Sequence, residues 1–321
     1  MNTYAPTTIT FPGLGIEIDP PQSFAIGENF SIHLYALCIA LGLLLAIFYG
    51  YKRAKEFGHN FDDMVDGILF IVPLAVICTR AYYCIFNWER YADNPIEVFY
   101  IWEGGLAIYG GVIGAVIGIL IYSKWKKVKV GAVLDITSLG FLIGQTLGRW
   151  GNFFNREAFG SETENFLRMG LYQQVLENGD IVSSSTMYYY HPTFLYESLW
   201  NATGFVLLHF LSKKRKYDGQ IALGYVAWYG LGRSFIEGLR TDSLYWGPFR
   251  VSQMLALVSF LVALGLLVYN MFRQHDPENM QVNITNARLA AAAEDEAVAV
   301  EAEPEAEVEE PAEDTQEDEN G

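Results

Sequence analysis

Cysteine is scarce in this 321-residue sequence, and its three copies, Cys38, Cys78 and Cys84, all lie within apolar runs. A disulfide framework or a structural metal site needs cysteines in paired spacing, usually on loops. We therefore interpret all three as small buried apolar residues. No histidine, cysteine and aspartate cluster has the spacing of metal ligands either, so we expect neither a metal ion nor a cofactor.

Basic residues are absent from the first 30 positions. Because a cleavable signal peptide begins with a positively charged region, we expect none here. The hydrolase motifs H-E-x-x-H and G-x-S-x-G are also absent, and no pair of aspartates stands out in the apolar runs, which argues against an intramembrane protease. The main alternative from another class is a secondary transporter, but such proteins often contain internal repeats, and none is apparent here.

Net charge is small outside one segment of the chain. The whole sequence carries −16, but residues 276–321 contain 16 acidic residues and one arginine and so account for −15. The remainder is nearly neutral, and we expect no nucleic-acid partner. Residues 290–321 are rich in alanine and glutamate and have no apolar face, so we expect an acidic, disordered tail over 276–321.

Long apolar runs are abundant, and 51% of the residues are hydrophobic. A helix of about 20 apolar residues spans the roughly 30 Å hydrocarbon core of a bilayer. The sequence therefore predicts an all-α, polytopic membrane protein with seven transmembrane helices. The seven blocks lie at about 31–51, 64–86, 105–123, 131–149, 192–212, 219–238 and 251–272.

The orientation follows from the basic residues of the short loops, which favour the cytoplasmic side. Eleven of the 21 lysines and arginines lie in three alternate loops, at 52–55, 124–129 and 213–216. This distribution predicts an N-terminus outside and a C-terminus in the cytoplasm. We expect residues 1–30 to form an extracytoplasmic segment and 31–275 a seven-helix catalytic domain. The connection at about 150–191 is long enough to form a small extracytoplasmic cap after the fourth helix.

Charged residues inside the predicted helices are costly and therefore mark candidate functional positions. Arg80 and Asp135 are the least informative, since structural ion pairs between helices would explain them. Arg233, Glu237 and Arg240 are spaced i, i+4, i+7, which places them on one face of a helix.

An excess of arginine marks the outer third of the predicted bundle. Arg149, Arg233 and Arg240 outnumber Glu197 and Glu237, so an anionic ligand would complete the charge balance. The planar guanidinium fork suits phosphate. A purely structural scaffold would not explain this excess.

Glycines are spaced four apart in the third block, at Gly110, Gly114 and Gly118. Packing of another helix against these small residues is the simpler interpretation. Close approach of a lipid or peptide to the backbone is the functional alternative.

The densest polar motif is G-R-W-G-N-F-F-N-R-E-A-F-G at 148–160. It closely resembles the signature of the bacterial prolipoprotein diacylglyceryl transferases. Five further motifs agree with that family in the same order, and the resemblance covers about residues 25–272. They are S-I-H-L-Y at 31–35, T-R-A-Y-Y at 79–83, W-E-G-G-L-A-I-Y-G-G at 102–111, H-P-T-F-L-Y-E at 191–197 and Y-G-L-G-R-S-F-I-E-G-L-R at 229–240.

The resemblance implies a seven-helix, multi-pass enzyme of the bacterial inner membrane. Such enzymes transfer the diacylglyceryl group of phosphatidylglycerol to the lipobox cysteine of a preprolipoprotein, which forms a thioether and releases glycerol phosphate. The implied partners are therefore phosphatidylglycerol, the lipobox peptide and the surrounding membrane lipids.

The resemblance also assigns roles to matching residues. Arg149 would hold the lipid phosphate with Arg240 nearby, and Arg233 and Glu237 would form the paired charges beside the reacting atoms. The remaining matches are Tyr35 and three signature residues, Asn152, Glu157 and Gly160.

One position departs from the family pattern. Some relatives have a histidine where this chain has Tyr109, and that histidine has been proposed as the base for the thiol. A tyrosine, with a reference pKa near 10, is a poor base at neutral pH. Tyr109 would then only position substrate, or the base lies elsewhere, for instance at Glu237 or Glu197.

Overall fold

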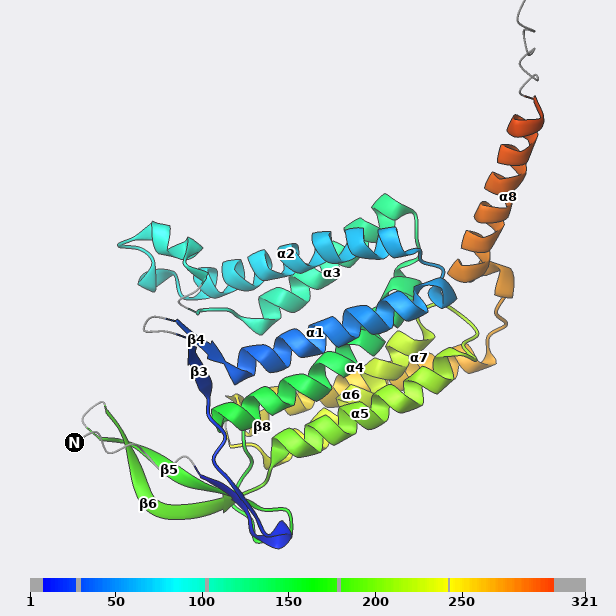
Figure 1. The fold of residues 1–321 in the computed structure, drawn as a ribbon. Coiled ribbons are helices and arrows are strands. Elements are labelled where there is room, and N and C mark those ends of the chain that lie inside the picture. The colour runs from blue at the N-terminus through cyan, green and yellow to red at the C-terminus, as the bar shows by residue number, and fades with distance from the viewer. Residues whose placement is uncertain (1–7, 27–29, 102–103, 178–179, 242, 303–321) are drawn as a thin grey trace, which may run out of the picture.

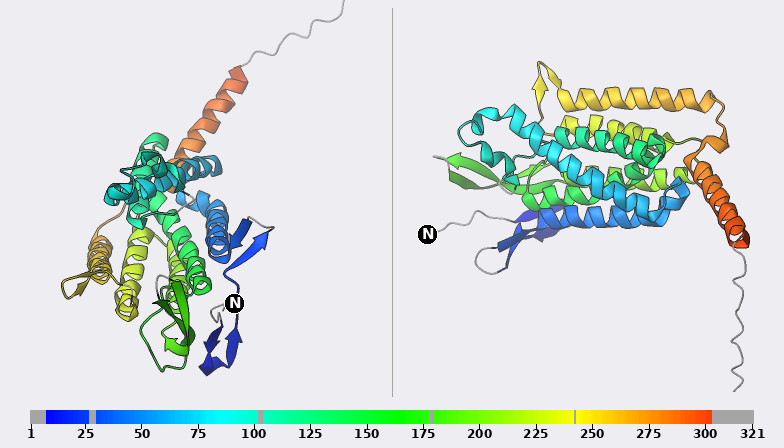
Figure 2. Two further views of the ribbon diagram at one scale, coloured as in Figure 1. Left: turned by 90° about the vertical axis from the view of Figure 1, so that its left-hand side faces the viewer. Right: turned by 90° about the horizontal axis from the view of Figure 1, so that it is seen from above.

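The computed structural model describes residues 8–26, 30–101, 104–177, 180–241 and 243–302. Seven long helices run roughly alongside one another (Figures 1 and 2), and each coincides with one of the seven apolar blocks. They are α1 (Leu34–Arg53), α2 (Phe61–Phe86), α3 (Ile108–Lys126), α4 (Val130–Asn155), α5 (Thr193–Ser212), α6 (Gln220–Ile236) and α7 (Val251–Phe272).

Five helices of the described part are long and apolar enough to cross a membrane: α1 with the 3-10 turn that follows it, α2, α3, α4 and α7. Of the other two, α6 has 17 residues, and α5 contains Glu197, Asn201 and His209 within its 20 residues. The chain is therefore a helical membrane protein, as predicted from its long apolar runs.

Helix α4 organises the bundle because it packs against α1, α3, α5 and α6. One apolar core lies where α4, α5 and α6 meet the end of α1, and it includes Phe57, Leu139, Leu142 and Ile221. The α2–α3 hairpin touches the rest of the bundle mainly where α3 meets α4.

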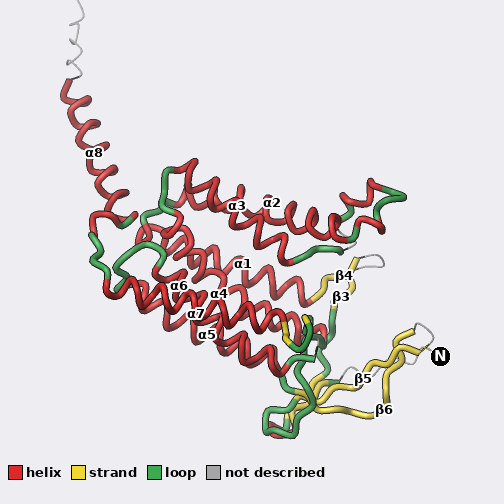
Figure 3. The backbone as a smooth tube through the Cα atoms, turned by 180° about the vertical axis from the view of Figure 1, so that it is seen from behind, coloured by secondary structure: helices red, strands yellow, loops and turns green. Residues whose placement is uncertain are grey.

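Strands gather at one end of the bundle (Figure 3), so the fold is not purely α-helical as predicted. The four-stranded sheet has the order β2-β1-β5-β6, with β1 (Ile9–Phe11) antiparallel to both β2 (Ile16–Ile18) and β5 (Met169–Glu177), and β5 antiparallel to β6 (Asp180–Tyr190). Two short hairpins join β3 (Ser23–Ile26) to β4 (Phe30–His33), and β7 (Tyr245–Trp246) to β8 (Phe249–Arg250).

The composition of β6 explains this difference. The segment D-I-V-S-S-S-T-M-Y-Y-Y is rich in β-branched and aromatic residues, which favour a pleated, half-buried surface. A second apolar core joins this sheet to the helices, with Ile9 and Leu171 packed against Phe153 of α4 and Phe194 of α5. The sheet is therefore fixed over the adjoining ends of α4 and α5.

Among the described residues, neither Arg80 nor Asp135 makes the interhelical ion pair that would have explained it. The Arg80 guanidinium donates to four backbone carbonyls, those of Glu97, Val98, Gly104 and Gly105, at 2.6–3.1 Å. It therefore holds the α2–α3 connection in place.

Asp135 accepts from the backbone amides of Gly219 at 2.9 Å and Ala222 at 2.8 Å. It satisfies amides that have no intrahelical partner at the start of α6. In both cases the charged side chain hydrogen-bonds to backbone groups. The spacing of charged residues in a sequence does not reveal such partners.

The glycine row of α3 faces α2. A Cβ built at Gly110 would lie 2.3 Å from the Cys78 carbonyl oxygen, and one at Gly114 would lie 2.7 Å from the Cys78 Cβ. Helix packing is therefore the role of this row, and our alternative of a close approach by lipid or peptide is wrong for these positions.

A last helix, α8 (Gln281–Ala302), leaves the bundle at the end opposite to the strands (Figure 1), after a 3-10 turn at Pro277–Asn279. We expected disorder over 276–321, whereas the structure has helix as far as Ala302. Alanine and glutamate are strong helix formers, which accounts for the difference. Residues 303–321 of the predicted tail, residues 1–7 and 27–29 of the predicted N-terminal segment, and Trp102 and Glu103 of the third motif lie outside the described residues.

Candidate active site

Glu197, in the second turn of α5, is the centre of a buried charged cluster. Its Oε1 lies 2.8 Å from a terminal guanidinium nitrogen of Arg233 and 3.6 Å from one of Arg240, and its Oε2 pairs with Arg149. Arg233 also pairs with Glu237, four residues along the chain. Residues from α4, α5, α6 and the segment after α6 thus converge on one point.

Guanidinium groups outnumber carboxylates among the described residues of this cluster. Three guanidinium groups, those of Arg149, Arg233 and Arg240, face two carboxylates. The Glu197 and Glu237 side chains are only 4% and 2% exposed, whereas that of Arg149 is 22% exposed. The positive side of the cluster is therefore the accessible one, and it can accept an anion.

Arg149 is oriented by its own helix. Its guanidinium donates to Asn152 Oδ1 at 3.2 Å, and the Asn152 amide donates to Glu157 Oε1 at 3.0 Å. Asn155 donates to the same Glu157 oxygen at 3.2 Å. Helix α4 does continue to Asn155, so Arg149 and Asn152 share a face. Glu157 thus connects to the cluster through Asn152.

A tight reversal after α4 brings Gly160 to the cluster. The backbone of Gly160 pairs with that of Arg240 as an isolated antiparallel bridge, and its amide donates to the carbonyl of His191 at 2.9 Å. A Cβ at Gly160 would lie 2.7 Å from His191 Cβ and 2.9 Å from the Leu239 carbonyl oxygen. Only glycine fits, and the contact sets the position of Arg240.

We predicted that Arg233, Glu237 and Arg240 share one face of a helix, and this prediction is only partly correct. Helix α6 ends at Ile236, a 3-10 turn follows at Glu237–Leu239, and Arg240 has extended backbone. Arg233 and Glu237 still meet, but Arg240 reaches Glu197 from the extended strand that pairs with Gly160.

The two tyrosines differ in their relation to the cluster. The Tyr35 ring, at the start of α1, packs on Gly151, where a Cβ would lie 2.7 Å from the ring. It therefore lies beside the turn that carries Asn152. Tyr109 is 47% exposed on α3, with its ring 6.4 Å from that of Tyr82, and within the described residues it has no hydrogen bond or ion pair to the cluster.

A pair of tryptophans that we did not predict joins α5 to α6. The Trp200 and Trp228 rings stack at 4.4 Å, and each indole nitrogen donates to the other residue's carbonyl, at 3.0 and 2.9 Å. Each ring occupies the space above a glycine of the opposite helix, Gly204 or Gly232. The pair fixes the register of the two helices next to Glu197 and Arg233; the only signal in the sequence was a tryptophan near a glycine in both helices.

Comparison with known proteins gives a consistent result. The family model described as prolipoprotein diacylglyceryl transferase matches residues 21–269. A phosphatidylglycerol–prolipoprotein diacylglyceryl transferase of Listeria monocytogenes serovar 1/2a is 39% identical over 270 residues, which is 84% of this chain and 96% of the relative.

Two further relatives carry the same name. One from Bacillus licheniformis is 41% identical over 263 residues, covering 81% of this chain and 96% of the relative. One from Limosilactobacillus reuteri is 42% identical over 248 residues, covering 75% and 88%. With a matched region that includes the whole charged cluster, this chain belongs to the prolipoprotein diacylglyceryl transferase family.

Proposed function

We propose that this chain transfers the diacylglyceryl group of phosphatidylglycerol to the lipobox cysteine thiol of preprolipoproteins, the first step of lipoprotein maturation. Membership of the transferase family supports the reaction class. The observation that carries the assignment to this site is the convergence of Arg149, Arg233 and Arg240 on Glu197, with the Arg149 side chain 22% exposed.

The reaction is a displacement at carbon. The cysteine sulfur forms a bond to the glycerol carbon that carries the phosphate, the C–O bond to that phosphate breaks, and glycerol phosphate leaves with the bonding electrons. The thiol loses its proton. Because a free thiol is only a few per cent thiolate at pH 7, the enzyme must favour the thiolate as well as the departing phosphate.

Cationic side chains serve both needs. Guanidinium groups fixed beside a developing negative charge stabilise the transition state more than water does, because they need no reorganisation. In this proposal Arg149, the most exposed of the three, holds the lipid phosphate, and Arg240 completes the contact. Arg233 lies beside the reacting atoms and is oriented by Glu197 and Glu237.

The signature residues support these groups. Asn152 and Glu157 orient Arg149, and Gly160 sets the position of Arg240. Tyr35 packs on Gly151 in the last turns of α4. Tyr109 positions substrate and takes no part in proton transfer, in line with the lack of a hydrogen bond or ion pair from it to the charged cluster within the described residues. Glu197 and Glu237 remain the alternatives for the base.

The proposed topology places this chemistry at the outer face of a bacterial inner membrane. All seven helices cross the bilayer, with the N-terminus outside and the C-terminus in the cytoplasm. Three loops rich in lysine and arginine at the other end support this orientation. Residues 1–30 and the cap at about 150–191 are then extracytoplasmic, 31–275 form the catalytic domain, and 276–321 form the cytoplasmic tail.

The test is transfer by purified protein in detergent, with phosphatidylglycerol and a lipobox peptide, followed by mass spectrometry of the peptide. We expect a diacylglyceryl adduct on the cysteine with the unchanged protein and a loss of at least about 100-fold with Arg149→Ala or Arg233→Ala, as for lost transition-state contacts. Arg90→Ala is the matched control, since Arg90 is exposed at the strand end of the bundle. Near-normal turnover in both cluster variants would exclude the phosphate role.

A further inference from the structure

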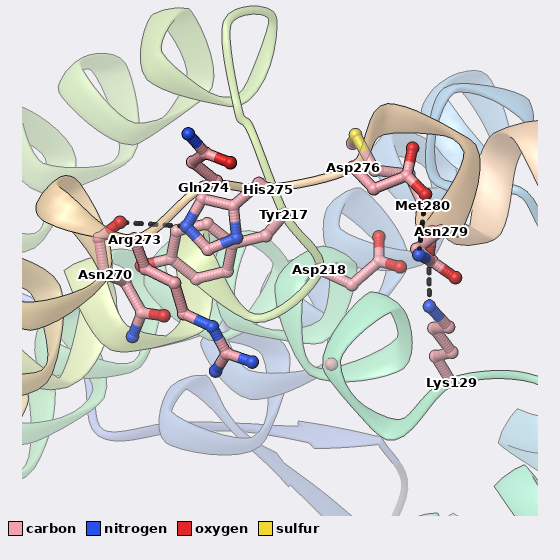
Figure 4. A pocket seen from close by; sticks show the side chains of 11 residues that line it. Lys129, Tyr217, Asp218, Asn270, Arg273, Gln274, His275, Asp276, Asn279 and Met280 are labelled. Atoms are coloured by element: carbon pink, nitrogen blue, oxygen red, sulfur yellow. Dashed lines mark hydrogen bonds between the residues drawn. The ribbon is translucent and has the colours of Figure 1, made fainter.

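A cavity of about 420 Å³ lies at the end of α7, next to the loops rich in basic residues (Figure 4). Arg273 and the stacked rings of Tyr217 and His275 form one side of it, and Lys129 and Asp218 lie beside them. A second cavity of the same volume shares Arg273, His275 and Met280 and adds Arg215 and Lys216 to the lining. Together they form one polar groove.

Two cations of this groove have no partner in the described part of the chain. Neither the Arg273 guanidinium nor the Lys216 ammonium takes part in a hydrogen bond or ion pair with a described residue. The other two are occupied: the Lys129 ammonium donates to the Asn279 carbonyl, and Arg215 donates to the carbonyls of Ser212 and Glu56. The groove therefore offers two free positive charges.

The acidic residues of the groove do not neutralise them. Asp276 accepts hydrogen bonds from the Glu278 amide at 3.0 Å and the Asn279 side chain at 2.9 Å. Asp218 Oδ2 accepts from the Gln281 amide at 2.7 Å. Among the described residues, neither carboxylate forms an ion pair with Arg273 or Lys216.

The depth of the groove points to a lipid. Arg273 directly follows Met271 and Phe272, whose residues are 75% and 84% exposed at the end of a membrane-spanning helix. Such exposed apolar side chains face acyl chains, so Arg273 lies at headgroup level. The 22 residues of α7 span about 33 Å, which places the groove in the leaflet opposite to the arginine cluster.

One wall of the groove is built by the segment after α7. Gln281 is 1% exposed, and its Oε1 accepts from the Lys129 amide at 2.9 Å. Thr285 donates to the Gly58 carbonyl at 2.8 Å. A Cβ at Gly58, where φ is +79°, would lie 2.6 Å from the Gln281 backbone. This docked segment lies beyond residue 269, where the family match ends, whereas Lys129, Lys216 and Asp218 on the facing side lie within the matched region.

We propose that this groove binds the headgroup of an anionic phospholipid in the leaflet that faces the basic loops. Arg273 and Lys216 contact the phosphate. A phosphoglycerol headgroup brings a net negative charge to these cations. In a phosphocholine headgroup the quaternary ammonium offsets the phosphate, so it binds more weakly.

The test counts lipids on the full-length protein by native mass spectrometry after purification with phosphatidylglycerol or phosphatidylcholine. We expect Arg273→Gln/Lys216→Gln to retain one phosphatidylglycerol fewer than the unchanged protein, with affinity reduced about tenfold or more for the lost charged contacts. Arg273→Lys with Lys216 intact keeps both charges and retains the lipid. Lys124→Gln/Lys214→Gln is the control, because it removes two cations on the same side that do not line the groove.

Equal lipid counts for the groove variant and the unchanged protein, or an equal loss in the control, would overturn the proposal. Inorganic phosphate distinguishes a lipid from a free anion: retention of the lipid in millimolar phosphate supports the headgroup site, and its displacement there assigns the groove to phosphate instead. The readout is a lipid count and needs no turnover, so failure of the transferase assay and failure of this proposal are separate results.

Discussion

Replacing Glu197 by glutamine tests the charged cluster directly. Glutamine keeps the size of the side chain and one acceptor oxygen, but it removes the charge that faces Arg149, Arg233 and Arg240. Removing one partner of a buried ion pair costs about 3–5 kcal/mol because the other charge stays buried. Since glutamine can still accept from Arg233, we expect a loss near the lower limit, about 3 kcal/mol in the free energy of unfolding.

Thermal unfolding in detergent measures this loss. A change of about 3 kcal/mol corresponds to a fall of roughly 6–12 °C in Tm. The same variant should lose at least about 100-fold in transfer of the diacylglyceryl group, because Arg233 loses a group that orients it. Glu164→Gln provides the matched control: Glu164 is exposed, and we expect a change within about 0.5 kcal/mol. If the two variants unfold at the same temperature, the cluster is not the buried, coupled unit inferred here.

Three further outcomes follow from individual contacts. Gly160→Ala places a methyl group 2.9 Å from the Leu239 carbonyl oxygen, so we expect at least a tenfold loss of transfer as Arg240 is displaced; unchanged kinetics would contradict the role of that bridge. Tyr109→Phe should retain most of its activity, measured as peptide adduct per minute, because the hydroxyl makes no hydrogen bond to the cluster within the described residues; a large loss would return Tyr109 to the candidates for proton transfer. Burial lowers the pKa of His59, which lies between α1 and α2, below its usual 6.5, so the unfolded chain binds a proton at a higher pH than the folded chain does. The contribution of His59 to the free energy of unfolding should therefore be complete above about pH 6.5 and fall as the pH drops below that value. Unfolding measured from pH 8 to 5 checks this, and the fall should be less steep in His59→Gln.

The helices and the charged residues of the site could be predicted because both leave a local signal. Apolar runs of about 20 residues defined seven blocks, and seven helices coincide with them. The arginines stood out because charge inside an apolar run is costly and therefore rare. The charge imbalance in the sequence predicted an anionic ligand, and in the structure the three arginines meet on Glu197.

What the sequence did not reveal depends on the backbone and on distant contacts. Arg80 and Asp135 bind carbonyls and amides, which every residue carries, so no residue type identified the partner. The register set by Trp200 and Trp228 requires each ring to find a glycine on another helix. The sheet was missed because its strands come from two segments 160 residues apart, at Thr10 and Gly170.

The density of the motif at 148–160 has a structural cause. Arg149 must stand in the last turns of α4, and the chain must then reverse at once so that Gly160 can pair with Arg240. The reversal places Arg156 and Ala158 at φ values of 55° and 56°, which cost about 1–2 kcal/mol each in residues other than glycine.

Specific bonds offset that strain. Arg156 donates to the carbonyls of Phe154 and Pro20, and Thr193 donates to that of Ala158 at 2.5 Å. The turn therefore holds only while the N-terminal segment and the start of α5 are both in place. Since the same turn sets the distance between Arg149 and Arg240, a substitution such as Thr193→Val should weaken phosphate contact without touching any charged residue. A higher KM for phosphatidylglycerol, with folding intact, would show that the turn acts through the spacing of the two arginines; an unchanged KM would show that their spacing does not depend on it.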